Sequence, residues 1–457
     1  MKFTTYFLLF SASLFVLSCQ SIGKKSQVTV QTRTLSAQSM TQTDKFGDQN
    51  RAILRRDTPL SNLDHFPKIM SFSALNMERP MYVRAKDKMV TIVDRGDTLG
   101  FEGVKYPDES IILQELHRRF SLFQGYTLGL NRRRYDLNYA YLSSKKIYEE
   151  QKIYLESAFK KFKVGRDFKK QMQREIRYSY FCNLLGPYSI TNTNVDSISP
   201  IFVETLNGCK KDLQNAIKTR KGTDKNVHTL VYDYNRFLSR KAMATDTAFD
   251  YQWLMADKNF KGETREYIKF RLLKENFGAI GNYESAYNQF KTTCKDKDFV
   301  AYLDRLAVNN THIFNAEELT STLQDTAGQK LTWANILEKN KGKKIYLIVG
   351  NAYTLQLFGK ELTEKAAYFE KHETQIVFVL TDRKKEQWQK VLETVVLPNF
   401  QQYYLGASDL PIQRVLEQPF SFVSTHFLDK TGRIALKNAA NPNKQGLLMR
   451  QLVYAVR

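Results

Sequence analysis

Five consecutive apolar residues, Ile345 to Val349, followed by Gly350-Asn351, constrain the fold of this chain more than any other short stretch. A β-branched and aromatic run of this length, closed by Gly-Asn, predicts a buried strand that enters a turn. A second such run, QIVFVL at 375–380, comes after an amphipathic helix predicted for 354–371. Parallel strands joined by a helix belong to one sheet with helices on both faces. The chain from Thr311 onward therefore predicts an α/β domain.

Further elements on either side of these strands complete the predicted domain, 311–457. Turn residues in LQDTAGQKL (323–331) and at 430–433 predict two hairpins, the second of them between THFLD and IALK. Helices are predicted for 383–395, which contains Trp388, and for 446–455.

The first 19 residues have the composition of an export signal. Lys2 precedes a mostly apolar run that ends at Ser18-Cys19 and is shorter than the ~20 apolar residues of a transmembrane helix. A small residue before a cysteine at this place resembles the bacterial lipobox, which makes Cys19 the candidate lipidation site. Ordinary secretion with cleavage near Ser18 is the alternative. Residues 20–64, rich in Ser, Thr, Gln and Lys, predict a flexible tether.

The net charge of +22 fits a partner that is nucleic acid, an anionic membrane surface or an acidic glycan. Export argues against nucleic acid. Between Arg118 and Tyr180 there are 16 Lys or Arg and 6 Asp or Glu, an excess of 16 − 6 = +10, which includes Arg132, Arg133 and Arg134. This basic segment is either a face that contacts anionic lipid or glycan or a solvated helix surface. We favour the solvated surface.

The middle of the chain predicts two further regions. Residues 65–107 contain the short β-type runs MYVRA (81–85) and MVTIVD (89–94), which indicate a small antiparallel β region. Residues 108–310 have helical periodicity, and Asp108-Glu109-Ser110 resembles a helix start. The predicted fold class is thus α+β and multidomain.

The cysteines that remain after export do not form a familiar chemical motif. Cys182, Cys209 and Cys294 include no CxxC and no spacing typical of a metal site. A disulfide is permissible in an exported protein, and Cys182 and Cys209 are the pair closest in sequence. Buried, unreactive thiols are the favoured interpretation. Neither a metal nor a cofactor is predicted.

The ordered motifs of the C-terminal domain resemble those of the TlpA-like thiol–disulfide oxidoreductases, especially lipoproteins of Bacteroidetes type. An L-x-D-x-x-G-x-x-L pattern opens the domain at 323–331, and Gly342-Lys343 leads into the first strand. A second turn pattern, I-D-x-x-G-x-I in the family, is matched by 428–434. The upstream order of a short β region and a helical region is also similar, and GDTL at 96–99 resembles a domain that often precedes these proteins. The resemblance implies a thioredoxin-like fold.

The chain departs from this family where the family carries its chemistry. The resemblance places a WAxWCxxC motif directly after the strand, which here puts Leu355 and Phe358 at the two cysteine positions. Val423 takes the position of the usual cis-proline. Disulfide exchange requires a thiolate with a depressed pKa at a helix N-terminus. Neither side chain can supply one, so the resemblance carries over the fold and not the activity, and no catalytic residue is predicted.

Three functions follow as hypotheses. The first is a non-redox lipoprotein at the cell envelope, facing the periplasm, that binds an envelope protein or peptide or serves as a structural module. The second is an oxidoreductase that uses Cys182, Cys209 or Cys294. The third is recognition of an anionic surface or glycan through the basic helices. Tyr353 and Thr354 carry the reactive hydroxyls of the turn. A Thr354 nucleophile would need a base such as His426, and this is disfavoured against a histidine that contacts solvent or a backbone carbonyl.

Overall fold

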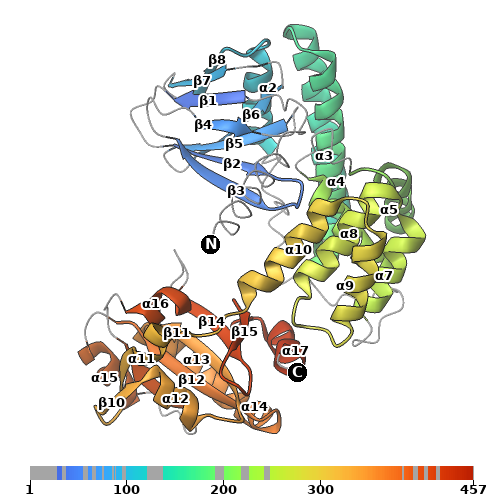
Figure 1. The fold of residues 1–457 in the computed structure, drawn as a ribbon. Helices are drawn as coiled ribbons and strands as arrows, with labels where there is room; N and C mark the ends of the chain where they lie inside the picture. The colour runs from blue at the N-terminus through green and yellow to red at the C-terminus, as the bar shows by residue number, and fades with distance from the viewer. Residues whose placement is uncertain are drawn as a thin grey trace, which may run out of the picture. The chain divides into compact units, whose positions relative to one another are not determined.

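The computed structural model describes residues 28–455 of the chain apart from 33–37, 55–59, 64–67, 75–76, 85–86, 88, 95–98, 121–136, 191–199, 218–225, 241–247, 383–384, 395–399, 406–409 and 418–422. The chain divides into two compact units, Met1–Ile268 and Lys269–Arg457. The second unit therefore begins inside the segment 108–310 that was predicted as one helical domain. Figure 1 shows the elements of both units, which are described in turn.

The N-terminal unit begins with two four-stranded sheets (Figure 1). The first has the order β4-β1-β7-β8, with β1 parallel to β7 and its other pairs antiparallel. The second has the order β3-β2-β5-β6 and is antiparallel throughout. The strands are β1 (Val28–Thr32), β2 (Gln38–Thr43), β3 (Gln49–Leu54), β4 (Leu60–Leu63), β5 (Lys68–Ala74), β6 (Met77–Val83), β7 (Met89–Asp94) and β8 (Leu99–Glu102).

The second sheet contributes to two hydrophobic cores because side chains alternate between the faces of a strand. Met70 and Phe72 of β5 pack in one cluster with Val90 and Ile92 of the first sheet. Ile69, the residue before Met70 and so on the other face of β5, packs instead in a cluster with side chains of three helices. The same alternation holds in β6. The two sheets thus form a sandwich whose outer face on one side is covered by helices.

Two predictions for this region need correction. The flexible tether predicted for 20–64 contains four strands between Val28 and Leu63. The polar composition of the segment as a whole obscured them, although β1, VTVQT, alternates Val with polar residues. MYVRA and MVTIVD lie in β6 and β7, which belong to different sheets and do not pair with each other. A strand rich in Met and Ser, β5, completes the sandwich.

Helices follow the sandwich, as the periodicity of the sequence predicted, and the first begins at Asp108 as expected. They are α2 (Asp108–Phe120), α3 (Leu137–Lys161), α4 (Arg166–Ile190), α5 (Pro200–Leu213), α6 (Val227–Arg240), α7 (Ala248–Asn259) and α8 (Gly262–Glu275). The division between the two units falls within α8. Buried side chains of α2, α3 and α4 form the cluster that covers the second sheet.

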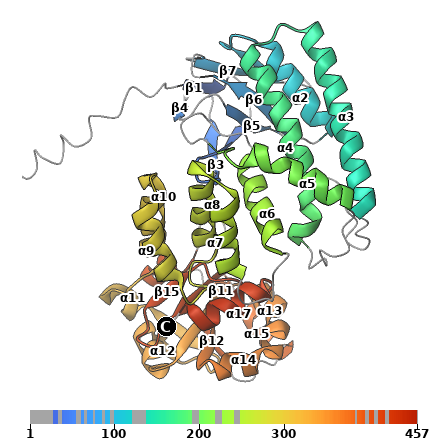
Figure 2. The ribbon, with the colours of Figure 1, turned by 90° about the vertical axis from the view of Figure 1, so that its right-hand side faces the viewer.

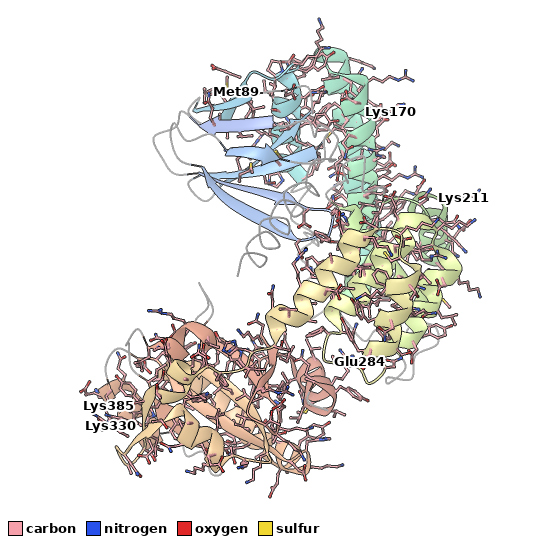
Figure 3. All side chains as sticks on the ribbon, in the orientation of Figure 1. Met89, Lys170, Lys211, Glu284, Lys330 and Lys385 are labelled. Carbon is pink, nitrogen blue, oxygen red and sulfur yellow. The ribbon has the colours of Figure 1, made fainter. Side chains whose placement is uncertain are left out.

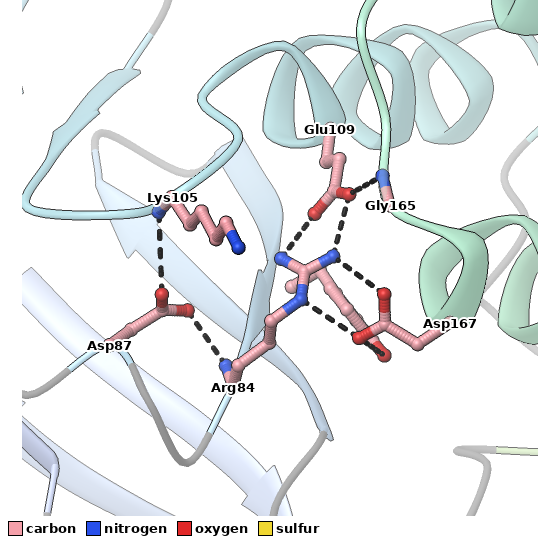
Figure 4. Close-up of polar contacts among 7 residues, drawn as sticks. Arg84, Asp87, Lys105, Glu109, Gly165 and Asp167 are labelled. Atoms are coloured by element: carbon pink, nitrogen blue, oxygen red, sulfur yellow. Dashed lines mark hydrogen bonds and ion pairs between the residues drawn. The ribbon is translucent and has the colours of Figure 1, made fainter.

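A buried ion-pair cluster joins the sandwich to these helices (Figure 4). Arg84, directly after β6, places its guanidinium between Glu109 of α2 and Asp167 of α4. Its Nη1 lies 2.5 Å from Glu109 Oε2, and its Nε lies 2.8 Å from Asp167 Oδ2. Hydrogen bonds of this bidentate, charged kind are about twice as strong as neutral ones. One planar group therefore fixes the end of a strand against two helices.

The surroundings of Arg84 leave little freedom. Glu109 is almost fully buried, and its Oε1 also accepts a hydrogen bond of 2.8 Å from the Gly165 amide. A Cβ atom at Gly165 would lie 2.8 Å from Nη2 of Arg84 and 2.6 Å from Oδ1 of Asp167, so a side chain there would displace this ion pair. The backbone N–H of Arg84 itself donates to Asp87, 2.8 Å away. Each polar group at this junction thus has a partner within the cluster.

The C-terminal unit is built on a seven-stranded sheet of order β10-β9-β13-β12-β11-β14-β15. The neighbours β11, β12 and β13 are parallel, whereas β14 is antiparallel to β11 and to β15. The strands are β9 (Thr322–Asp325), β10 (Lys330–Thr332), β11 (Lys344–Gly350), β12 (Thr374–Leu380), β13 (Gln401–Tyr404), β14 (Val423–Leu428) and β15 (Ile434–Lys437). A parallel pair beside an antiparallel hairpin is the arrangement that the sequence predicted.

Helices cover both faces of this sheet. The described helices of this unit are α9 (Tyr283–Thr293), α10 (Lys297–Asn310), α11 (Ala316–Thr320), α12 (Trp333–Lys339), α13 (Ala352–Glu364), α14 (Ala366–Lys371), α15 (Lys385–Thr394), α16 (Pro411–Leu416) and α17 (Gln445–Tyr454). Side chains of α13, α14, α15 and α17 pack on one face, against Tyr346 and Ile348 of β11. Side chains of α12 and α16 pack on the other, against Ile345, Leu347 and Val349. The central strand is buried on both faces.

Most elements predicted for this unit are confirmed, with two differences. The helix predicted for 354–371 is two helices, α13 and α14, with the break at Lys365. The strand β13 was not predicted, because its sequence QQYY has no apolar alternation. Both predicted hairpin turns are present. In each, an Asp accepts backbone hydrogen bonds across the turn and a glycine has positive φ, Gly328 at +84° and Gly432 at +82°.

The cluster around Arg84 yields a stability prediction. Replacing Arg84 with Met leaves Glu109 buried without its cation, so Arg84→Met should lower the free energy of unfolding by ~3–5 kcal/mol. The matched change Arg118→Met removes an arginine that is paired with Glu115 and is itself 63% exposed, and it should leave the urea midpoint nearly unchanged. The double variant Arg84→Met/Glu109→Leu should recover most of the loss. Urea unfolding of the three proteins measures this, and equal losses in the two single variants would contradict it.

Candidate functional site at the end of β11

The candidate site is the point where β11 ends and α13 begins, because the family resemblance implies a dithiol there. Asn351 caps α13: its side-chain Oδ1 accepts hydrogen bonds of 3.0 Å from both the amide and the hydroxyl of Thr354. Asn is among the preferred N-cap residues. The helix therefore begins at Ala352, and Leu355 lies a full turn inside it rather than at its terminus.

Leu355 and Phe358, the two positions expected to carry sulfur, are core residues. Their exposed fractions are 0% and 2%. With Leu362 they lie at i, i+3 and i+7, on the face of α13 that meets the sheet. They belong to one cluster with Tyr346, Ile348, Phe378 and Trp388. Apolar side chains thus fill the space that a reactive dithiol would need.

The positive end of α13 is also occupied, by the carboxylate of Asp382. Its Oδ2 accepts a hydrogen bond of 2.8 Å from the Ala352 amide. Helix N-termini stabilise anions, and a thiolate at such a place owes part of its low pKa to these amides. In this chain the side chains of Asp382 and Asn351 accept the hydrogen bonds of the Ala352 and Thr354 amides. Burial raises the pKa of Asp382, against the hydrogen bond from the Ala352 amide.

Close packing holds the turn itself. A Cβ atom at Gly350 would lie 2.8 Å from Oγ1 and 3.0 Å from Cβ of Thr354, so the absence of a side chain lets Thr354 sit over the end of β11. Gly350 pairs in register with Val423, the residue at the expected cis-proline position and the first of β14. Val423 packs against the same core cluster as Leu355. The three positions carried over from the family therefore lie together around one hydrophobic core.

His426 is on the opposite side of the sheet from Thr354. It is directly opposite Leu347 in register, and paired residues share a face. Leu347 belongs to the cluster of α12 and α16, whereas α13 covers the other face. The Nε2 atom of His426 lies 2.8 Å from the Leu416 carbonyl, and burial lowers the pKa of His426 to about 4. The interpretation as a histidine that contacts a backbone carbonyl is confirmed.

The cysteines of the helical segment are buried. The disulfide considered between Cys182 and Cys209 does not form, and both are free thiols. Their Sγ atoms lie near backbone oxygens of Asn226 and Thr205, at 3.8 and 3.5 Å. Burial raises the pKa of both thiols well above the usual value, which opposes thiolate formation. Cys294 is also buried, at the C-terminal end of α9.

Several predicted site residues lie outside the described residues: Cys19, Arg132, Arg133 and Arg134. Other cations of the basic segment and of the next helix, among them Lys170 and Lys211 in Figure 3, are exposed on α4 and α5. Among the residues that the structure describes, no group of three or more His, Cys, Asp or Glu could hold a metal ion. None of the described helices has both the length and the apolar stretch that crossing a bilayer requires.

Two residues of this site were not identified from the sequence, Asn351 as the helix cap and Asp382 as the carboxylate at the helix end. For Asn351 a signal existed, since Asn before an amphipathic helix is a common N-cap. Asp382 comes to α13 only because β11 and β12 are adjacent and parallel, which places their carboxyl ends side by side. Its role depends on tertiary structure.

The raised pKa of Asp382 yields a pH-dependent prediction. The folded protein binds this proton more tightly than the unfolded chain, so the contribution of Asp382 to stability falls as pH rises through the raised pKa. Asp382→Asn has no charge to bury and should gain stability relative to the wild type between about pH 4 and pH 7. Asp382→Ala leaves the Ala352 amide without its acceptor and should lose ~1–3 kcal/mol. Urea unfolding at both pH values measures this, and an Asn variant whose advantage shrinks with pH would contradict it.

Comparison with known proteins gives matches to solved structures. No family model and no curated protein sequence matches the chain. The chain is similar to the thioredoxin domain of a thiol–disulfide oxidoreductase of Bacteroides vulgatus, with 20% identity and a TM-score of 0.24 over 30% of this chain and 94% of that one. It is similar to a thiol:disulfide interchange protein of a Bacteroides species, with 24% identity and a TM-score of 0.23 over 27% and 78%.

A third match is a secreted disulfide oxidoreductase of Mycobacterium tuberculosis, with 19% identity and a TM-score of 0.24 over 30% of this chain and 99% of that one. All three are thiol–disulfide oxidoreductases, and their activity is a property of those proteins. The fold of the C-terminal unit rests on its own strand order and directions: β12-β11-β14-β15, with β11 and β12 parallel and the last two strands an antiparallel hairpin.

Proposed function

We propose that this chain is a non-redox lipoprotein of the cell envelope, attached by a lipid on Cys19 and facing the periplasm, whose C-terminal unit serves as a structural module. The observation that carries this proposal is the burial of Leu355 and Phe358 in the core of that unit, at the positions where the resemblance expects a dithiol. The leader sequence supports export and the lipid anchor.

The geometry at the end of β11 favours a structural role over a peptide-binding groove. The space at Leu355 and Phe358 is filled, and the helix end is closed by Asn351 and Asp382. The large hydrophobic side chains that α13 exposes here are Tyr353 and Leu357, with exposed fractions of 68% and 47%. An envelope protein or peptide that binds at this end would contact these two side chains on the surface of the helix.

The second hypothesis, an oxidoreductase that uses unusual cysteines, has less support. A nucleophilic thiol must ionise and must reach its substrate. Cys182 and Cys209 lie in the interior of the N-terminal unit, where burial raises their pKa. The burial of Cys182 and Cys209 and the raised pKa of their thiols therefore support the non-redox proposal.

Core membership of Phe358 can be measured directly. Phe358→Ala removes a buried aromatic side chain and should lower the free energy of unfolding by ~3–5 kcal/mol. Tyr353→Ala, on the same helix and exposed, should change it by less than ~0.5 kcal/mol. The measurement is urea unfolding of both variants. A small loss for Phe358→Ala would mean that an open site, rather than a packed core, lies beneath α13.

Redox activity gives the test of the proposal itself. The purified protein should fail to accelerate the reduction of insulin by dithiothreitol, because no thiol lies at the end of α13. The variant Leu355→Cys/Phe358→Cys should also fail, since its two thiols would be buried and α13 would still be capped. A thioredoxin that contains CxxC serves as the positive control. Turnover by the wild type would overturn the non-redox proposal, and turnover by the variant alone would overturn the closed site.

Thiol labelling separates the remaining oxidoreductase hypothesis. Cys182, Cys209 and Cys294 should react with Ellman's reagent only after the protein is unfolded. Rapid reaction of one of them in the folded protein would identify the nucleophile that the second hypothesis requires.

A further inference from the structure

A cavity of about 770 Å³ lies within the N-terminal unit, between the sandwich and the helices α2 and α3. Helices α2 and α3 contact each other, and α2 contacts β6; Figure 2 shows the two helices beside the strands. The cavity walls come from both sheets, at Arg79 of β6 and Phe101 of β8, from α2, and from the last two turns of α3. Its volume is in the range of small-molecule sites, ~300–1,000 Å³.

The charge of the lining is positive. Arg79, Arg118, Arg119 and Lys161 face a single acid, Glu115, which gives a net charge of 4 − 1 = +3. Glu115 accepts hydrogen bonds from Arg118 at 2.7 and 2.9 Å and from Arg119 at 2.5 Å. These hydrogen bonds, that from Arg118 first, lower the pKa of Glu115 to about 2. The carboxylate therefore stays ionised at neutral pH and balances only one of the two guanidinium charges.

Packing orders the cations of the cavity before any ligand arrives. The guanidinium of Arg119 lies 5.2 Å from the centre of the Tyr154 ring, and the Lys161 ammonium lies 5.3 Å from the centre of the Phe162 ring. Cation–π contacts of this kind, together with the shared carboxylate of Glu115, limit the rotamers of these long side chains. Ordering the site in advance reduces the entropy cost of binding an anion.

An apolar surface adjoins these cations. Phe101, Tyr154, Ala158 and Phe162 contribute to the lining, together with Ile111 of α2. The side chain of Ile111 is half exposed, with an exposed fraction of 50%, although it is a large aliphatic group. A ligand with an apolar body would cover Ile111 and the rings beside it, at a gain of about 25 cal/mol for each Å² removed from water.

We propose that this cavity binds a small amphiphilic anion, with its carboxylate or phosphate group held by Arg118, Arg119 and Lys161 and its apolar body against Phe101, Ile111 and Tyr154. The proposal concerns the N-terminal unit alone and goes beyond the structural role of the C-terminal unit, so either can fail without the other. The ligand chemistry is a single anionic group joined to a hydrocarbon chain. A free fatty acid and a membrane phospholipid are two sources of it.

Calorimetric titration of the full chain with dodecanoate, below the concentration at which it forms micelles, tests the site. We expect saturable binding of one dodecanoate per chain, and binding of inorganic phosphate and of dodecanol at least tenfold weaker. Arg118→Gln/Arg119→Gln should weaken dodecanoate binding at least tenfold, because each charge-assisted hydrogen bond contributes about a factor of ten. Both side chains are more than half exposed, so the variant should fold, and circular dichroism checks this.

A matched variant separates the site from general charge. Lys170→Gln/Lys211→Gln also removes two positive charges, at exposed positions that do not line the cavity (Figure 3). It should bind dodecanoate as the wild type does. Ile111→Gln should weaken dodecanoate binding about tenfold. Equal losses in the two double variants, or no saturable binding of dodecanoate by the wild type, would overturn the proposal.

Vesicles distinguish the two sources of ligand. Binding to phosphatidylglycerol vesicles that Arg118→Gln/Arg119→Gln loses and Lys170→Gln/Lys211→Gln keeps identifies a membrane lipid as the source. Binding of dodecanoate without such vesicle binding identifies a free amphiphile. Both outcomes support the cavity as the site. Vesicle binding that falls equally in both double variants, with no dodecanoate binding, is attraction by net charge and overturns the proposal.

Discussion

The burial of β11 on both faces is the constraint on which the C-terminal unit depends. Residues Ile345–Val349 alternate between two cores, so helices must cover each face and other strands must pair with each edge of β11. The chain that leaves this strand can only turn at Gly350 and return along the sheet as α13. The first residues of α13 then determine which side chains lie at the carboxyl end of β11. Leu355 and Phe358 place buried apolar side chains there.

The N-terminal unit is arranged differently, because one of its sheets contributes side chains to two hydrophobic cores. Period-two alternation in β5 and β6 sends alternate residues toward the sandwich and toward the helices. Hydrophobic contact alone would allow the helices to slide on that sheet. The planar guanidinium of Arg84 pairs with Glu109 and Asp167 in a fixed geometry. It therefore sets where α2 and α4 lie on the sheet, in addition to holding them in contact with it. The same helix, α2, lines the cavity.

Sequence reasoning succeeded where a signal was local and failed where it was not. The runs at 345–349 and 375–380, and the Asp and Gly residues of two hairpins, each carry their structure within a few residues. β13, QQYY, has no apolar alternation and pairs with β12 and β9, whereas the alternating signal of β1, VTVQT, was obscured by the polar composition around it. The burial of Leu355 and Phe358 was testable only in three dimensions, and the contact of Asp382 with Ala352 depends on two strands being adjacent. The position of the candidate site was predicted from the family resemblance, whereas the contacts of its residues are known only from the tertiary structure.

The closed end of α13 has a consequence for how such a protein can change over time. A working dithiol at this place would need thiols outside the core, amides released from Asn351 and Asp382, and a helix that starts later. Any one of these changes alone leaves a cavity, an unpaired amide or an uncapped helix, and each of those lowers stability before it offers any activity. The exposed surface, as at Tyr353, tolerates substitution, while the interior of this site is fixed by its neighbours. The arrangement is therefore easy to keep and hard to reverse by single substitutions.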